Sequence, residues 1–164
     1  MTQIQMMKSA SSRQRNGGEW ATRKAGGPHG RPPLRSLEGR PLRVGYVSAD
    51  YCQHTVGLFV KDVIRNHDSE KVVAFAYSAG KVNDWITGTV RTACQFRDAT
   101  NLDDAALAQL ICKDEIDVLV DLSGHTAGSR LTVFAHRPAP VQVSWLGYFA
   151  TTGLSTFDAV LLDE

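Results

Sequence analysis

The stretch IDVLVDL, residues 116–122, decides the fold class of this chain. Apolar residues occupy both alternating sets of positions in it, which is typical of a central parallel strand that is covered on both faces. Parallel strands need crossover connections, and helices are the usual ones. The neighbouring sequence predicts such helices at 103–113 and at 130–136, one on each side of the strand.

Strand and helix patterns alternate in both directions from this stretch. The apolar alternation of LRVGYV (42–47) and the run KVVAFAY (71–77) predict two further strands. Right-handed crossovers would place all these strands in one sheet. We therefore expect residues 41–164 to form a Rossmann-like three-layer α/β lobe with a mostly parallel sheet. The remaining elements are expected as helices at 57–66 and 83–92 and as short strands at 94–97, 141–146 and 159–162.

Two of the expected helices carry signals for their start or their buried face. Asn101 is expected to cap the helix at 103–113, and Asp103 and Asp104 suit the positive end of its dipole. The apolar spacing of this helix predicts a buried stripe of Ala106, Leu107, Leu110 and Ile111. The helix at 57–66 is expected to bury Leu58, Phe59, Val63 and Ile64.

Residues 1–40 differ from the rest of the chain in charge. They hold eight of the 18 basic residues but two of the 17 acidic ones, so the net charge of +1 hides a basic segment followed by an acidic remainder. This segment is rich in Gly, Ser and Pro and poor in apolar residues, and we expect it to be a disordered tail. Such a tail can bind nucleic acid or an anionic membrane, or serve as a transit peptide. We favour a solvated tail without a specific partner.

Composition argues against several other classes of protein. The three cysteines lie far apart, which predicts neither a disulfide framework nor a zinc site. No apolar run approaches the ~20 residues that a membrane span needs. No apolar segment typical of a secretory signal follows the first residue. We expect a cytoplasmic protein without nucleic acid or a membrane as a partner.

Polar loops follow three of the predicted strands, at 48–57, 121–128 and 147–153. In an open α/β sheet the carboxyl ends of the strands share one edge, and ligands usually bind there. Together the loops contain two histidines, several carboxylates and hydroxyls, and glycines that allow a ligand to approach the backbone closely. This edge is therefore the expected site.

Asp50 and His54, in the first of these loops, are the candidates for acid–base chemistry. Asp50 would orient the imidazole and tune its proton affinity. In the alternative interpretation, Asp50 caps a turn and His54 bonds only to backbone; His125, in the second loop, is open to the same two interpretations. No HxH or HxxxH spacing is present, so no metal site is expected. Dinucleotide, P-loop and serine-nucleophile motifs are absent as well.

These loops, in this order, resemble the catalytic region of the protein O-GlcNAc transferase family, the SPINDLY-like glycosyltransferases. The resemblance rests on LRVGYVSADYCQH (42–54) and on residues 117–164, which include RPAPVQVSWLGYFATTG, and it covers about three quarters of the chain. It implies one half of a GT-B fold, in which two Rossmann-like lobes hold the sugar nucleotide between them. It also implies inverting, metal-independent transfer of N-acetylglucosamine from UDP-GlcNAc to Ser or Thr hydroxyls of an acceptor protein, without a cofactor.

The resemblance assigns roles to residues of two loops. Asp50 and His54 match a family loop beside the donor sugar and the acceptor, and they are the catalytic candidates. Leu146 and Gly147 match a WLGYP-type loop that contacts the sugar. The substrate-binding candidates are Leu146, Gly147, Tyr148, Phe149 and His125.

The chain departs from the family pattern at single positions. Thr55 stands where the family usually has proline, and Phe149 replaces the proline of GYP. Proline fixes φ, so both loops are expected to be looser here. His125 is tyrosine in some relatives, and no obligatory role is assigned to it.

The family's second lobe, which supplies most of the nucleotide contacts, has no counterpart in these 164 residues. We therefore expect a fragment with little or no transferase activity alone. Its expected partners are the acceptor protein and a separately encoded second catalytic lobe. Alternatively, the chain is a non-catalytic protein-binding module or a subunit of a split transferase.

Overall fold

The apolar stretch forms an interior strand of the sheet, β4 (Val118–Asp121), in a computed structural model that describes residues 30–148 and 151–162. In this part of the chain six strands form one sheet in the order β3-β2-β1-β4-β5-β6, and every neighbouring pair is parallel. The predicted α/β class is confirmed. The other strands are β1 (Leu42–Ser48), β2 (Val72–Ser78), β3 (Gln95–Asp98), β5 (Val141–Trp145) and β6 (Ala159–Leu161).

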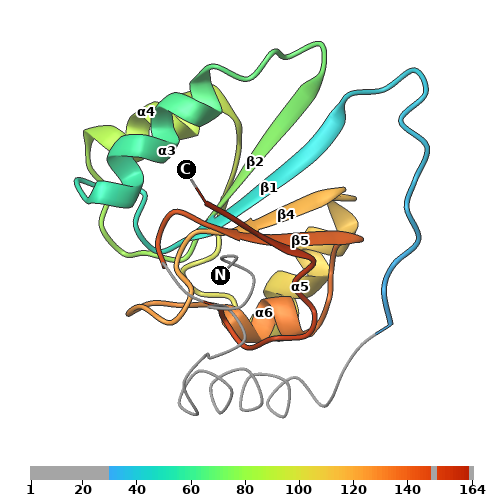
Figure 1. Ribbon diagram of the computed structural model, residues 1–164. Helices are drawn as coiled ribbons and strands as arrows, with labels where there is room; N and C mark the ends of the chain where they lie inside the picture. The colour runs from blue at the N-terminus through green and yellow to red at the C-terminus, as the bar shows by residue number, and fades with distance from the viewer. Residues whose placement is uncertain (1–29, 149–150, 163–164) are drawn as a thin grey trace, which may run out of the picture.

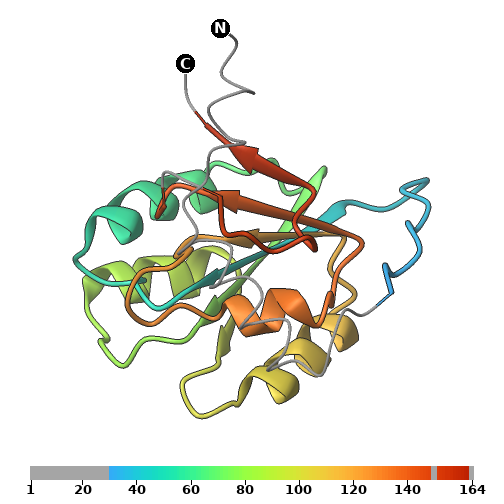
Figure 2. The same cartoon turned by 60° about the horizontal axis from the view of Figure 1, so that its bottom comes forward.

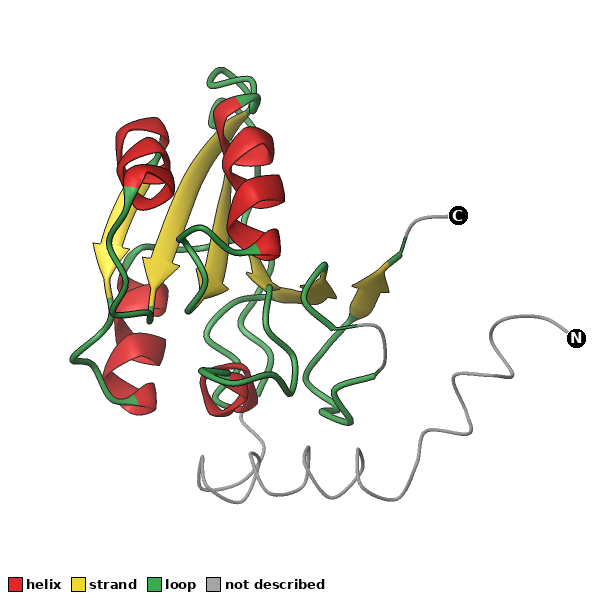
Figure 3. Cartoon of the chain, turned by 90° about the vertical axis from the view of Figure 1, so that its left-hand side faces the viewer, coloured by secondary structure: helices red, strands yellow, loops and turns green. Residues whose placement is uncertain are grey.

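Helices cover both faces of the sheet (Figures 1 and 3). One face carries α3 (Thr55–Arg65) and α4 (Trp85–Ala93), and the other carries α5 (Asp104–Lys113) and α6 (Leu131–Ala135). Each face has its own apolar core. The core under α3 and α4 includes Val60 and Val90, and the core under α5 and α6 includes Ile111. β6 is the edge strand beside β5 (Figure 2).

The buried face of α3 differs from the one predicted. The helix begins at Thr55, two residues before the expected start, and it buries Val56, Val60 and Ile64, which follow one another at intervals of four. Phe59 is 61% exposed and Leu58 is 43% exposed. The prediction was wrong for Leu58 and Phe59. The buried face had been assigned from neighbouring apolar residues, and the start of the helix at Thr55 turns a different set toward the sheet.

The capping residue of α5 lies two residues after the predicted one. Asp103, not Asn101, is the capping residue, and its side chain accepts a hydrogen bond from Ala106 N at 2.7 Å. Leu107 and Ile111 are buried as predicted. A carboxylate at the cap also suits the positive end of the helix dipole, which explains why it takes this position.

Residues 30–40, which the sequence assigns to the tail, contact the lobe through arginine side chains. Arg31 donates to Pro140 O at 2.8 Å, while Arg35 and Arg40 form ion pairs with Asp117 at 2.8 and 2.7 Å. The remainder of the predicted tail, residues 1–29, lies outside the described residues. No helix in the described ranges is long and apolar enough to cross a membrane.

Asp117 joins this segment to the starts of two strands. Its carboxylate also accepts from Arg43 N at 2.9 Å, and its own N–H donates to Arg43 O at 2.9 Å. Burial alone would raise the pKa of Asp117, but the hydrogen bonds from Arg40, Arg43 and Arg35 outweigh it and hold the pKa well below its ordinary value. The ionised carboxylate therefore stabilises the folded lobe.

The variant Asp117→Asn tests this contribution. It leaves Arg35 and Arg40 without their carboxylate, so we expect a loss of about 2–4 kcal/mol in the free energy of unfolding near pH 7. Because the folded pKa is depressed, the difference from wild type should shrink as the pH falls below the ordinary value of 3.8. Urea titrations at several pH values measure it. The control is Asp62→Asn, whose side chain is 55% exposed and whose removal should cost little.

Candidate functional site

The loops that follow β1, β4 and β5 lie against one another at the carboxyl edge of the sheet. Two glycines show how closely they pack. A Cβ atom added to Gly128 would lie 2.7 Å from the Cβ of Ala49, in the loop after β1. One added to Gly124 would lie 2.3 Å from the Cβ of Tyr148, in the loop after β5. The predicted convergence of these three loops is therefore present in the structure.

His54 lies at the start of α3 and caps it. Its backbone is extended, and its Nδ1 accepts a hydrogen bond from Val56 N at 3.3 Å. The imidazole is half exposed to solvent. Because Nδ1 is the acceptor, a neutral ring carries its proton on Nε2, which is then a donor toward a ligand. This is the backbone contact that the alternative interpretation of His54 predicts.

Asp50 lies close to His54 without a hydrogen bond to it. The Asp50 Oδ2 atom is 3.9 Å from His54 Nδ1, and the Asp50 N–H donates to Ser48 Oγ at 2.9 Å. For His54 to act as a base through Nε2, its proton must move to Nδ1 and find an acceptor there. Asp50 is the carboxylate within reach for that role after a small movement. The structure shows the capping arrangement; the acid–base arrangement requires His54 Nδ1 to exchange its contact with Val56 N for one with Asp50.

The end of β5 turns sharply at two predicted site residues. Leu146 has a φ of 69°, and Gly147 N donates to Trp145 O at 2.9 Å, which closes a three-residue turn. Side-chain-bearing residues adopt such a conformation at a cost. A Cβ atom at Gly147 would lie 1.8 Å from Leu122 O, so only glycine lets this turn pack against the end of β4. Phe149, the next prediction, lies outside the described residues.

His125 connects the second loop to the third. Its Nε2 donates to Thr152 O at 2.8 Å, and its ring meets the Tyr148 ring edge-on with centroids 5.3 Å apart. The imidazole, in the loop after β4, therefore contacts Tyr148 and Thr152 of the loop after β5. In the described structure these contacts of His125 hold the loop after β4 against the loop after β5.

Thr55 is the first residue of α3 and does not lie in the loop itself. The family's proline would occupy the first position of the helix, where proline's missing N–H and fixed φ are favourable. The replacement of proline by Thr55 therefore concerns the first turn of α3. The predicted loosening of the preceding loop stays a prediction.

Leu146 and Tyr148 border one hollow of about 560 Å³ with residues of α3 and β6. Sequence reasoning missed several of its walls. Phe59 was expected to be buried, and Leu161 and Leu162 were treated only as part of a strand. The lining residues are Thr55, Phe59, Trp145, Leu146, Tyr148, Leu161 and Leu162. This described lining contains no lysine or arginine, so it offers apolar contact and hydroxyl groups but no charge to balance a diphosphate.

Asp121 is a further residue of this edge that the site predictions omitted. It ends β4, is 1% exposed, and accepts hydrogen bonds from Ser123 N at 3.1 Å and Gly124 N at 2.8 Å. Burial raises the pKa of Asp121 to about 6, against the lowering effect of these two hydrogen bonds. The sequence signal was an acidic residue that ends an otherwise apolar strand.

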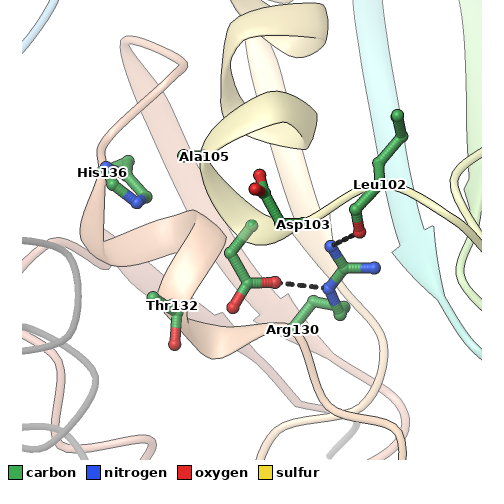
Figure 4. Close-up of a pocket in the computed structure, with 7 residues that line it drawn as sticks. Leu102, Asp103, Ala105, Arg130, Thr132 and His136 are labelled. Carbon is green, nitrogen blue, oxygen red and sulfur yellow. Dashed lines mark hydrogen bonds and ion pairs between the residues drawn. The ribbon is translucent and has the colours of Figure 1, made fainter.

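A second hollow, of about 380 Å³, lies between α5 and α6 on the other face (Figure 4). Arg130 crosses it and bonds to Asp104 Oδ1 at 2.5 Å and Leu102 O at 2.8 Å. None of the predicted site residues lines it. Its arginine is already engaged in holding α6 against α5, so we place the candidate site at the first hollow.

The described residues contain no group of three or more His, Cys, Asp or Glu side chains arranged to hold a metal ion. The predicted site residues among them, such as His54, Asp50 and Tyr148, carry imidazole, carboxylate and hydroxyl groups. Imidazole and carboxylate groups suit proton transfer to or from a bound ligand.

A parallel sheet with helices on both faces and polar loops gathered at one edge defines a Rossmann-like α/β lobe. Residues 28–164 match Glycosyl transferase family 41, and the chain belongs to this family. The resemblance drawn from its loops is thereby confirmed.

Individual relatives agree with this assignment. A probable UDP-N-acetylglucosamine–peptide N-acetylglucosaminyltransferase SPINDLY of Solanum lycopersicum is 38% identical over 129 residues, which are 76% of this chain and 14% of that protein. A UDP-N-acetylglucosamine–peptide N-acetylglucosaminyltransferase of Caenorhabditis elegans is 34% identical over 76% of this chain and 11% of its own length.

A solved O-GlcNAc transferase mutant of Thermobaculum terrenum has a TM-score of 0.85 and is 36% identical to this chain. The match covers 98% of this chain and 32% of that one. The chain therefore has the fold of one part of such an enzyme, and it spans about 14% of the length of the plant relatives.

The variant Gly147→Ala tests the sharp turn after β5. Because the added methyl group meets Leu122 O, a backbone atom, we expect a loss of about 2–3 kcal/mol in the free energy of unfolding. The matched control is Gly88→Ala in α4, where nothing lies within 4 Å of the added atom. That change should instead stabilise the chain by about 0.5–1 kcal/mol. Equal effects of the two variants in urea titrations would contradict the close packing.

Proposed function

We propose that this chain is the acceptor-side lobe of a protein O-GlcNAc transferase, which moves N-acetylglucosamine from UDP-GlcNAc to Ser or Thr hydroxyls of proteins. The observation that carries the proposal is its 34–38% identity, over three quarters of its length, to enzymes named for this transfer. The convergence of the loops with His54, Leu146 and Tyr148 at one edge supports it. The donor is a substrate, and neither a metal nor a cofactor is expected.

The proposed chemistry is a direct displacement. The acceptor oxygen forms a bond to the anomeric carbon of the sugar, the bond from that carbon to the UDP oxygen breaks, and the hydroxyl proton leaves to a base. His54 lies at the site and is the group proposed to act near the reacting centre, with Asp50 as its orienting carboxylate. Leu146, Gly147 and Tyr148 are proposed to contact the sugar, together with Phe149 of the same loop.

The leaving diphosphate needs a cationic group that the hollow does not provide among its described lining residues. We therefore propose that activity requires a second catalytic lobe, which supplies that group. The relatives are several times longer than the matched region, so they carry polypeptide that this sequence does not include. A cytoplasmic location, where nucleotide sugars and protein acceptors meet, is proposed with it.

His54→Asn separates the catalytic role from the capping role. Asparagine is a good helix cap, so α3 and the free energy of unfolding should be retained. Loss of the imidazole should reduce transfer by about 10²–10⁴-fold. The measurement is transfer of labelled N-acetylglucosamine from UDP-GlcNAc to a Ser/Thr peptide. The chain is assayed together with the remainder of the catalytic region of a relative, added as a separate polypeptide.

His67→Asn is the control, because His67 lies between α3 and β2, before the start of β2, and bonds to Tyr46 Oη. The proposal fails if His54→Asn transfers at the wild-type rate, or if no transfer occurs when the second polypeptide is bound. Transfer by the chain without any added polypeptide would contradict the need for a second lobe. Binding of an unrelated protein in place of the second lobe would favour the non-catalytic binding module.

Phe59→Ser tests where the second lobe binds. The ring is exposed and lines the hollow, so the change should leave the free energy of unfolding almost unaltered and weaken binding of the second polypeptide by about tenfold or more. Leu58→Ser is the matched control, since Leu58 is exposed on the same helix but does not line the hollow. Calorimetric titration compares the two, and equal binding by both variants would place the contact elsewhere.

A further inference from the structure

Asp121 is a buried carboxylate at the carboxyl end of β4, which lies between β1 and β5 in the sheet. Strands lie on both sides of it: in the register of the sheet, Val47 of β1 and Ser144 of β5 are its partners. Its side chain forms no ion pair with a lysine or arginine in the described parts of the chain, and His125 is the ionisable group whose charge acts on it. Burying a carboxylate without a cation is costly, so its presence calls for an explanation.

Two other carboxylates are buried in the described part of the lobe, and their contacts are those of a stabilising role. Asp114 accepts two hydrogen bonds from Arg97 and one from Tyr77 Oη, and Asp117 is paired with two arginines. Both lie at the opposite edge of the sheet, near the starts of the strands. Asp121 differs from them in having no arginine partner: the N–H groups of Ser123 and Gly124 donate to it, and the Ser144 hydroxyl is a further group that lowers its pKa. It differs also in its place at the edge with the site loops.

Those two N–H groups begin the loop after β4 and fix its contacts with the next loop. The first contact is between Gly124, with a φ of 55°, and Tyr148, which packs where a side chain at Gly124 would lie. The second is the hydrogen bond from His125 to Thr152 O. A shift of the loop start would move both contacts, and Tyr148 lines the hollow.

We propose that Asp121 is a positioning residue of the candidate site: by accepting from Ser123 N and Gly124 N, it holds the loop that places His125 and Tyr148. This inference deepens the proposed function, on which the identity of the ligand rests, because Tyr148 belongs to the wall proposed to contact the sugar. Ser123 N and Gly124 N donate to different oxygens of the carboxylate. Asparagine replaces one of these oxygens with an NH₂ group, which is a donor, so in this geometry one of the two N–H groups loses its acceptor.

Burial in this place has a consequence for stability. The pKa of Asp121 is raised to about 6, so protonation is favoured in the folded state relative to the unfolded one. The contribution of this group to stability therefore rises as the pH falls from above 6 toward the ordinary value of 3.8. The ionised form present near pH 7 is thus kept at a cost in stability, which agrees with a role in the site.

The test is hydrogen exchange of the His125 Nε2–H, followed by NMR in the full chain. In Asp121→Asn we expect exchange to be faster by about tenfold or more, the factor that loss of one hydrogen bond produces. The Tyr148 ring resonances should shift as well. Asp114→Asn is the matched control: it removes a buried carboxylate bonded to Arg97 and should lower the melting temperature without altering His125 exchange.

Unchanged His125 exchange in Asp121→Asn, or an equal change in Asp114→Asn, would overturn the proposal. Asp121→Ser, which also keeps a single acceptor oxygen, serves as a second variant with the same expectation. Loss of folding in both would show that the residue supports the lobe alone and would also overturn it. Titration of the wild-type chain with UDP-GlcNAc in the same spectra separates the two claims, since absent binding counts against the proposed function and leaves the exchange result intact.

Discussion

The carboxylate of Asp117 is the interaction on which the arrangement of this lobe most depends. It accepts from Arg43 at the start of β1 and pairs with Arg35 and Arg40 of the segment before it, while Val141 N, at the start of β5, donates to its backbone oxygen. One residue thus sets where three adjacent strands begin. The register fixed at these starts continues along the paired strands, whose carboxyl ends carry the site loops.

The acidic residues at the two ends of β4, Asp117 and Asp121, have opposite effects on stability. Asp117 is surrounded by arginines, and its charge favours the folded state; Asp121 is surrounded by strands and backbone N–H groups, and its charge opposes it. The difference follows from their partners, since both are almost fully buried. The ion pairs of Asp117 thus stabilise the fold at the starts of the strands, while the carboxyl edge includes costly features such as the charge of Asp121 and the turn at Leu146.

Local sequence patterns predicted most of this fold because each strand has a clear apolar signal and each loop a clear polar one. The parallel sheet and the three converging loops followed from the alternation of elements. Errors arose where a shift by one or two residues changes the outcome, as with Phe59, which moved from the expected core to the wall of the hollow. The cap at Asp103 and the state of His54 Nδ1 depend on side-chain geometry that a linear pattern does not contain. Asp121 shows a different limit of prediction, since its importance arises only from the strands that enclose it.

The edge strand β6 has a further consequence. It pairs with β5 on one side, and no strand covers its other side among the described residues. Uncovered backbone groups on an edge strand are templates for aggregation, here next to the exposed side chains of Leu161 and Leu162. A polypeptide that covered this edge would therefore also act as a guard against self-association of newly made chains.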